Sequence, residues 1–319
     1  MKKFFVTICL FLWAGLSLAA TEEGFSYVQK TDGAYYIKPK IKTGGDHFSP
    51  VDGPYGGMEL RTAFEAAYTQ ATPLGAHPLL SGANLKILGG AELTPVTLLP
   101  RLGLYFTPVP FLEFAAGGEF GTGWNAFGFD GMGVYEPAEQ DYRDLDAFKH
   151  YYWNTWASGT FQFDVGAIVP GEWTHVVMQA IYMVKYEALT GVDDGEVWVW
   201  RESENRANGL LFDFTGILGY KMPLRVKMIG VMFNAYGHYK GSDYGDYDAT
   251  FDGDFVTYVW KGFADITLNK SNSLTLLGLV SSRRSFATPY EEETDVPVLV
   301  KTGREWYLDG IAFRWTHQF

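Results

Sequence analysis

The sequence predicts an all-β protein: a closed antiparallel transmembrane β-barrel of about twelve strands. Large apolar and polar residues alternate in many segments along the chain, and a period of two is typical of strands with one apolar and one polar face. Aromatic residues make up 17% of the chain, although its mean hydropathy is only -0.06. This combination indicates a wall that faces lipid on one side and water on the other.

The N-terminus predicts export. Two lysines precede an apolar run over residues 4–18, and small residues at 19 and 20 allow cleavage. A positive start, a short apolar core and a small-residue exit are typical of a secretory signal peptide. We therefore expect residues 1–20 to be the signal and residues 21–319 to form one barrel domain.

Composition restricts the class of function further. Cys9 is the only cysteine and lies in the predicted signal peptide, so no disulfide framework is expected in the exported chain. The formal net charge of -12 argues against nucleic-acid binding, which requires a basic face. Beyond the signal there is no apolar run long enough for a membrane-spanning helix. Lipid satisfies no backbone hydrogen bonds, so a closed barrel is the remaining way to enter a membrane.

Twelve segments show the strand pattern. They cover residues 34–41, 58–70, 83–93, 97–106, 111–121, 151–167, 176–188, 210–220, 226–239, 255–268, 274–284 and 303–319. The first is weak because Pro39 cannot donate to a β-ladder. The second is clear, since Leu60 and Phe64 fall on one face and Arg61 on the other. The segment 226–239 is apolar on both faces in its middle, so its register stays open.

Turn signals separate these strands. Two prolines in residues 107–110 favour a tight turn, because neither can donate to a ladder; further turns are expected near Gly171, Pro223 and Asn272. Longer connections alternate with these short ones and are expected on the outer side of the membrane. They are residues 43–56, 122–148, 190–208, 240–253 and 287–302. Two connections fit less well: the outer join at Thr94 is short, and the inner one over 71–82 is long. A soluble β-sandwich, the alternative fold, also has many short strands but offers no reason for this alternation.

The chain ends in an aromatic, amphipathic strand. Phe313, Trp315 and Phe319 fall on one face of the last segment. This ending resembles the terminal strand of bacterial outer-membrane β-barrels, which closes the barrel and carries an aromatic last residue read by the assembly machinery. The resemblance implies an outer-membrane location, contact with outer-membrane lipid, and recognition of these three residues during assembly. His317 departs from the pattern, which usually has an apolar or aromatic residue there. No specific family with a known substrate is matched.

Charged residues on the polar strand faces are expected to line the lumen. They are Glu59, Arg61, Glu65, Lys86, Glu92, Arg101, Glu113, Glu119, Asp164, Lys185, Glu187, Asp213, Lys261, Asp265, Arg283 and Arg314. Charges of both signs can select among the solutes that pass a pore. They can also pair across strands and fill a narrow barrel without conduction. The expected function is therefore a small-solute pore or channel, or a structural surface barrel.

Other chemistry is less strongly indicated. The acidic outer segments, with Asp243 and Asp252 among their residues, could bind divalent cations, but they lack the spacing of a calcium loop. No metal site, cofactor or catalytic residue is expected, because no histidine lies in a recognised motif; a lipid hydrolase and a surface adhesin remain as alternatives. Trp198 and Trp200 share one strand face, which is a weak indication of a sugar-stacking platform. Aromatic residues at strand ends, such as Trp173, are expected to form interfacial girdles.

Overall fold

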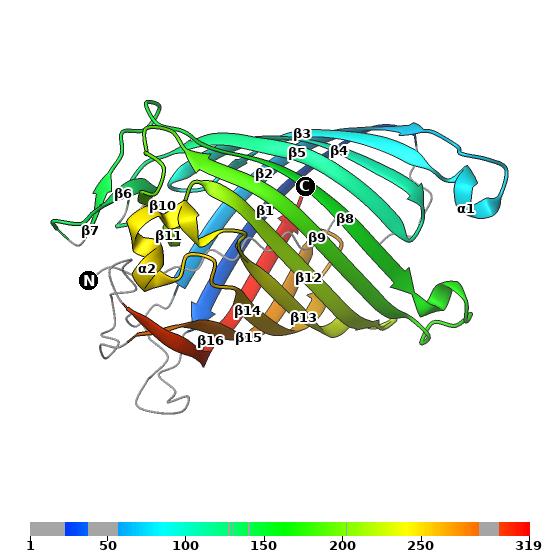
Figure 1. Ribbon diagram of the computed structural model, residues 1–319. Helices are drawn as coiled ribbons and strands as arrows, with labels where there is room; N and C mark the ends of the chain where they lie inside the picture. Colours follow the sequence, from blue (N-terminus) through cyan, green and yellow to red (C-terminus); the bar gives the residue numbers. More distant parts are fainter. Residues whose placement is uncertain are drawn as a thin grey trace.

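Twelve antiparallel strands form a closed barrel in the computed structural model (Figure 1). The structure describes residues 23–37, 57–126, 128–129, 131–139, 141–201, 203–286 and 300–319. They are β1 (Gly24–Ile37), β2 (Gly57–Ala71), β3 (Asn84–Leu93), β4 (Thr97–Val109), β5 (Leu112–Gly123), β8 (Tyr152–Asp164), β9 (Val176–Leu189), β12 (Gly209–Lys221), β13 (Val226–His238), β14 (Thr257–Thr267), β15 (Asn272–Phe286) and β16 (Lys301–Gln318). Each pairs with the next, and β16 closes the ring on β1 from Lys30↔Gln318 to Ile37↔Ile311. The predicted signal peptide and the predicted outer segment 43–56 lie outside the described residues.

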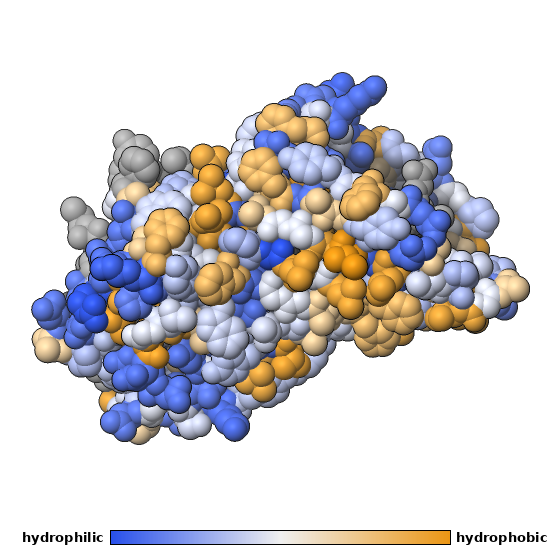
Figure 2. All heavy atoms as spheres, turned by 90° about the horizontal axis from the view of Figure 1, so that it is seen from above, coloured by the Kyte–Doolittle hydropathy of each residue, from blue (hydrophilic) through white to orange (hydrophobic). Residues whose placement is uncertain are grey.

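The wall has an apolar outer face. Leu102 near the middle of β4 is 62% exposed, and Leu218 on β12 is 50% exposed, although a soluble protein would cover apolar side chains within its strands. In Figure 2 apolar side chains occupy the middle of the face shown, and hydrophilic ones are more frequent towards the ends. Exposed tryptophans lie near both ends of the barrel: Trp173 and Trp315 at one end, and Trp306 at the other. An even number of strands closed behind such a wall is the architecture of bacterial outer-membrane barrels. The predicted fold and outer-membrane location are confirmed.

The two ends of the barrel differ. One end, which we call the inner end, has short turns, the small helix α1 (Pro78–Ser81), the start of β1 and the end of β16, since Gly24 pairs with Thr69 and Lys30 with Gln318. The opposite, outer end carries a second sheet (Figure 1), a four-stranded one in the order β11-β10-β6-β7. The alternation of short and long connections therefore follows the prediction. No helix among the described residues is long and apolar enough to span a membrane.

The outer sheet lies within segments that the sequence indicated only as long connections. Its strands are β6 (Met132–Glu136), β7 (Asp141–Asp144), β10 (Val197–Trp200) and β11 (Ser203–Ala207). The 3-10 helix η2 (Gly241–Tyr247) and the helix α2 (Asp248–Phe251) occupy a third such connection. Buried side chains such as Met132 and Leu189 pack the sheet against the barrel, so this end of the molecule has a core of its own.

Three predicted strand ranges differ from the structure by three residues or more. The strand predicted over 97–106 continues through Pro108 to Val109. The first strand begins at Gly24 rather than at residue 34, because residues 24–33 pair with β2 on one side and, from Lys30 on, with β16 on the other. The strand predicted over 151–167 ends at Asp164. There the chain turns into the 3-10 helix η1 (Val165–Ala167), and the Asp164 carboxylate accepts a hydrogen bond of 2.9 Å from the backbone N–H of Gly166.

Candidate functional site

A cavity of about 1010 Å³ runs inside the barrel and is lined by residues of all twelve barrel strands. At the outer end its lining includes Ser203 and Asn205 of β11, and at the inner end it includes the turn residues 269–271 and the first residue of β15. The lining therefore extends from one end of the barrel to the other. We call this cavity the lumen.

Most of the charged residues predicted to face the lumen line it. They are Arg61, Glu65, Lys86, Glu92, Arg101, Glu113, Glu119, Lys185, Glu187, Asp213, Lys261, Asp265, Arg283 and Arg314. Glu59 is not part of the lining but lies 3.6 Å from Arg314. Asp164 is at the inner end instead, where its carboxylate lies 3.0 Å from His175 and 3.8 Å from Lys221. Asp164 therefore organises a turn rather than the lumen.

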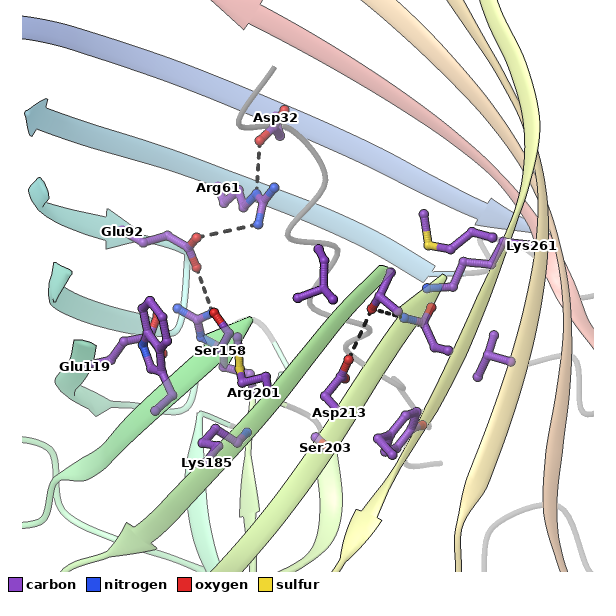
Figure 3. A pocket seen from close by; sticks show the side chains of 18 of the residues that line it. Asp32, Arg61, Glu92, Glu119, Ser158, Lys185, Arg201, Ser203, Asp213 and Lys261 are labelled. Carbon is purple, nitrogen blue, oxygen red and sulfur yellow. Dashed lines mark hydrogen bonds and ion pairs between the residues drawn. The ribbon is translucent and has the colours of Figure 1, made fainter. Parts of the chain in front are cut away.

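A chain of ion pairs follows the wall near the outer mouth, from β1 across β2 and β3 to the outer sheet (Figure 3). Asp32 lies 3.0 Å from Arg61, Arg61 lies 3.5 Å from Glu92, and Glu92 lies 2.7 Å from Arg201. Arg201 belongs to the outer sheet connection between β10 and β11, and its Nε also donates a hydrogen bond of 2.8 Å to Thr97 Oγ1 on the wall. The outer segment is thus attached to the wall by charge-assisted hydrogen bonds.

A second attachment centres on Glu187, whose side chain is 1% exposed. Its carboxylate contacts Arg206 of β11, lies 2.6 Å from Lys185 Nζ, and accepts a hydrogen bond of 3.1 Å from the Tyr152 hydroxyl. Asn154 in turn donates to the Tyr152 hydroxyl at 2.9 Å. A buried carboxylate is tolerated where its oxygens are paired in this way. Outer sheet and barrel are therefore joined at two separate points.

Other lumen carboxylates have hydroxyl or amide partners instead. The Asp213 carboxylate accepts a hydrogen bond of 3.1 Å from the Thr215 hydroxyl, and the Asp265 carboxylate accepts one of 3.1 Å from the Thr275 hydroxyl. In the same way, Asp309 accepts from Ser281 and Glu119 from Asn154. In the described part of the chain, no lysine or arginine lies within ion-pair distance of Asp213 or Asp265. Among the same residues, no carboxylate lies within ion-pair distance of Lys86. The lumen thus has ion pairs near its outer mouth and carboxylates hydrogen-bonded to hydroxyl or amide groups elsewhere.

Several lumen residues were not singled out from the sequence. Asp32 was missed because the first strand was predicted too short. Tyr105 and Trp156 line the lumen as well, and the inward parity of their strands could have located them. Arg201 and Arg206 come from the outer sheet, and no signal in the sequence ties that sheet to the wall.

The suggestion of a sugar-stacking platform at Trp198 and Trp200 is wrong. The two side chains are 0% and 3% exposed. Trp200 stacks on Tyr152, with ring centroids 4.6 Å apart, and Trp198 meets the same ring at 6.0 Å. Their shared face packs into the core between outer sheet and barrel, so neither ring has a free face for stacking.

The acidic outer segments hold several ion pairs. Arg143 lies 2.6 Å from Glu136, and the hydrogen bond from Lys149 holds the pKa of the Asp146 carboxyl below its usual range. Across the described residues no group of three or more metal-ligating side chains could hold a metal ion. The residues of the third acidic segment, 287–299, lie outside the described chain. Divalent-cation binding stays a prediction.

Two described histidines lie beside carboxylates. His175 Nδ1 is 3.0 Å from Asp164, and His238 Nδ1 is 2.9 Å from Asp243. Within the described ranges, no serine hydroxyl is hydrogen-bonded to a histidine, which a serine hydrolase would require. Both histidines instead link a strand end to a neighbouring turn.

The predicted assembly residues lie on the lipid-facing side of β16. Phe313 is 39% exposed, Trp315 is 41% exposed and Phe319 is 72% exposed. His317 lies between them, with its ring centroid 5.9 Å from that of Trp315 and 4.4 Å from that of Phe319. The imidazole therefore continues the row of rings.

Comparison with known proteins finds similarity only at the level of solved structures. No protein-family model matches the chain, and no curated protein sequence matches it. The KdgM porin is 4% identical with a TM-score of 0.34, and the match covers 92% of this chain and 98% of that one. The outer-membrane channel DcaP of Acinetobacter baumannii is 12% identical with a TM-score of 0.35, covering 92% and 97%. Pseudomonas putida OprB at high pH is 8% identical with a TM-score of 0.34, covering 93% and 94%. The fold assignment rests on the barrel itself.

Proposed function

We propose that this barrel is an outer-membrane pore through which small polar solutes diffuse. The observation that carries the proposal is the lumen, whose lining extends from Ser203 at the outer end to Asn272 at the inner end. A barrel that served only as a scaffold could fill this space with side chains, as small eight-stranded barrels do.

The outer sheet limits the size of the solutes. Arg201 and Arg206 attach it to Glu92 and Glu187 at the mouth, and its residues Ser203 and Asn205 line the outer end of the lumen. Charged side chains of both signs line the lumen, which favours polar solutes over apolar ones. Small hydrophilic molecules therefore fit the site best.

The lipid-facing residues Phe313, Trp315 and Phe319 support a further part of the proposal: recognition of the last strand by the outer-membrane assembly machinery. The same reasoning assigns residues 1–20 to a signal peptide that directs export. The apolar wall would then lie among the acyl chains of the outer membrane.

Solute entry into vesicles tests the pore directly. Full-length protein is refolded into lipid vesicles, and swelling is recorded in solutions of sugars of increasing size. We expect entry to fall steeply with solute size. Ser158→Phe, which places a large ring in the lumen, should slow entry, whereas Thr155→Phe should not, because Thr155 lies on the lipid-facing side of the same strand. Equal entry into vesicles with and without protein would contradict the proposal.

A further inference from the structure

We propose that Tyr105 and Trp156 form a carbohydrate-binding platform on the wall of the lumen. The inference rests on the proposed pore, since the sugar would be one of its solutes. Tyr105 lies on β4 and Trp156 on β8, with β5 between them, and both side chains line the lumen. Their ring centroids are 6.1 Å apart and their planes are inclined at 57°.

Two glycines let the rings lie against the wall. Gly103 pairs with Gly117, and Gly117 pairs with Trp156. A Cβ at Gly117 would come 2.7 Å from Trp156 Cζ2, and a Cβ at Gly103 would come 2.8 Å from Tyr105 Cε2. Each ring therefore occupies space that a side chain at the glycine would take, and both half-buried side chains line the lumen.

Hydrogen-bond donors and acceptors line the same lumen as the rings. Lys86 Nζ lies 4.5 Å from the centroid of Tyr105, and no carboxylate of the described chain is within ion-pair distance of it. Glu113 lines the same lumen from β5, and Ser158 and Thr160 follow Trp156 on the inward face of β8. An ammonium donates hydrogen bonds, a carboxylate accepts them and a hydroxyl does both.

This arrangement fits a sugar better than other small solutes. A pyranose has an apolar face of C–H groups and a rim of hydroxyls that both donate and accept. Large rings with a few convergent polar groups bind such a molecule by stacking and fix its orientation by hydrogen bonds. Trp198 and Trp200, by contrast, have no exposed face to offer.

The test uses maltotriose, a neutral glucose trisaccharide, as the probe. Ion current through the full-length barrel is recorded in a planar bilayer as maltotriose is added, and binding to the detergent-solubilised barrel is measured by calorimetry. We expect saturable binding and a saturable fall in current. Trp156→Ala and Tyr105→Ala should each weaken binding by about tenfold, which corresponds to about 1.4 kcal/mol, and Trp156→Phe should weaken it less.

Trp153→Ala is the matched control. Trp153 lies on the same strand but on the lipid-facing side, where its ring is 5.4 Å from that of Tyr186, so binding should be unchanged. An equal fall in current with a polyethylene glycol of similar mass, or binding unchanged in all the Trp156 and Tyr105 variants, would overturn the platform and leave the pore intact. A barrel that binds maltotriose through Trp156 but carries no current would support the platform and overturn the pore.

Discussion

Arg201 Nη1 lies 2.7 Å from Glu92 Oε1, and this ion pair joins the outer sheet to the barrel wall. Arg201 has a backbone φ of 53°, in the left-handed region that residues other than glycine rarely adopt. The ion pair offsets the cost of that conformation, which is of the order of 1 kcal/mol. The turn between β10 and β11 is therefore held by the side chain at its own strained position.

Replacing Arg201 by glycine separates the effect of the ion pair from the effect of the strained backbone. Glycine adopts a positive φ without strain, so Arg201→Gly removes the ion pair and leaves the turn intact. We expect the outer sheet to move away from the mouth more often, and the bilayer current to become larger and noisier. Arg143→Gly, which removes an exposed pair within the outer sheet, is the control. A current unchanged by Arg201→Gly would show that the sheet does not restrict the mouth.

Trp200 should contribute to the stability of the fold rather than to solute binding. Because its side chain is 3% exposed and stacks on Tyr152, Trp200→Ala should lower the free energy of unfolding by about 3–5 kcal/mol. Maltotriose binding by the folded variant should stay unchanged. Urea titration in detergent measures the first effect and calorimetry the second. Trp173→Ala, at a 52% exposed position, should change stability little; a similar loss at both positions would contradict the assignment of Trp200 to the core.

The lipid-facing wall predicts a depth-dependent cost for charge. Leu102 is 62% exposed near the middle of β4, so Leu102→Arg should cost about 2–4 kcal/mol of folding free energy in lipid vesicles. Phe25 is 86% exposed at the inner end of β1, where the same substitution should cost about 0–1 kcal/mol. If the two variants unfold at the same denaturant concentration, the wall does not face an acyl-chain interior.

The last residue should matter for assembly more than for stability. Phe319 is 72% exposed and lies beyond the end of β16, so little packing is lost in Phe319→Ala. We expect less barrel in the outer membrane of expressing cells, but an unchanged unfolding midpoint for the variant refolded from urea. Phe25→Ala, another exposed phenylalanine at the inner end, should leave the membrane level unchanged. Normal membrane levels of Phe319→Ala would exclude its role as an assembly signal.

Barrel strands were predictable where one face is continuously apolar. In β2, Leu60 and Phe64 alternate with charged residues, and the whole strand follows the prediction. In β1, Phe25 and Tyr27 lie outward but are followed on the same face by Gln29 and Thr31, so the alternation of hydrophobicity is lost and the strand was placed too late.

The outer sheet and its contacts could not be predicted for a different reason. β10 reads Val-Trp-Val-Trp, and all four residues are buried, so both its faces are covered and neither shows an alternation. Four or five residues of this kind do not distinguish a strand from a loop. Arg201 and Thr97 are about 100 positions apart along the chain, and Arg206 and Glu187 are about 20 positions apart. The two-residue period of a strand does not show which distant residues come into contact.

Single-channel recording in a planar lipid bilayer tests the central claim, that a water-filled lumen crosses the barrel. Full-length protein is refolded, and folding is verified by its altered gel mobility before heating. We expect discrete, stable current steps at neutral pH, reduced by Ser158→Phe and unchanged by Thr155→Phe. Folded barrel that inserts into the bilayer and produces no current above that of bare lipid would contradict the account.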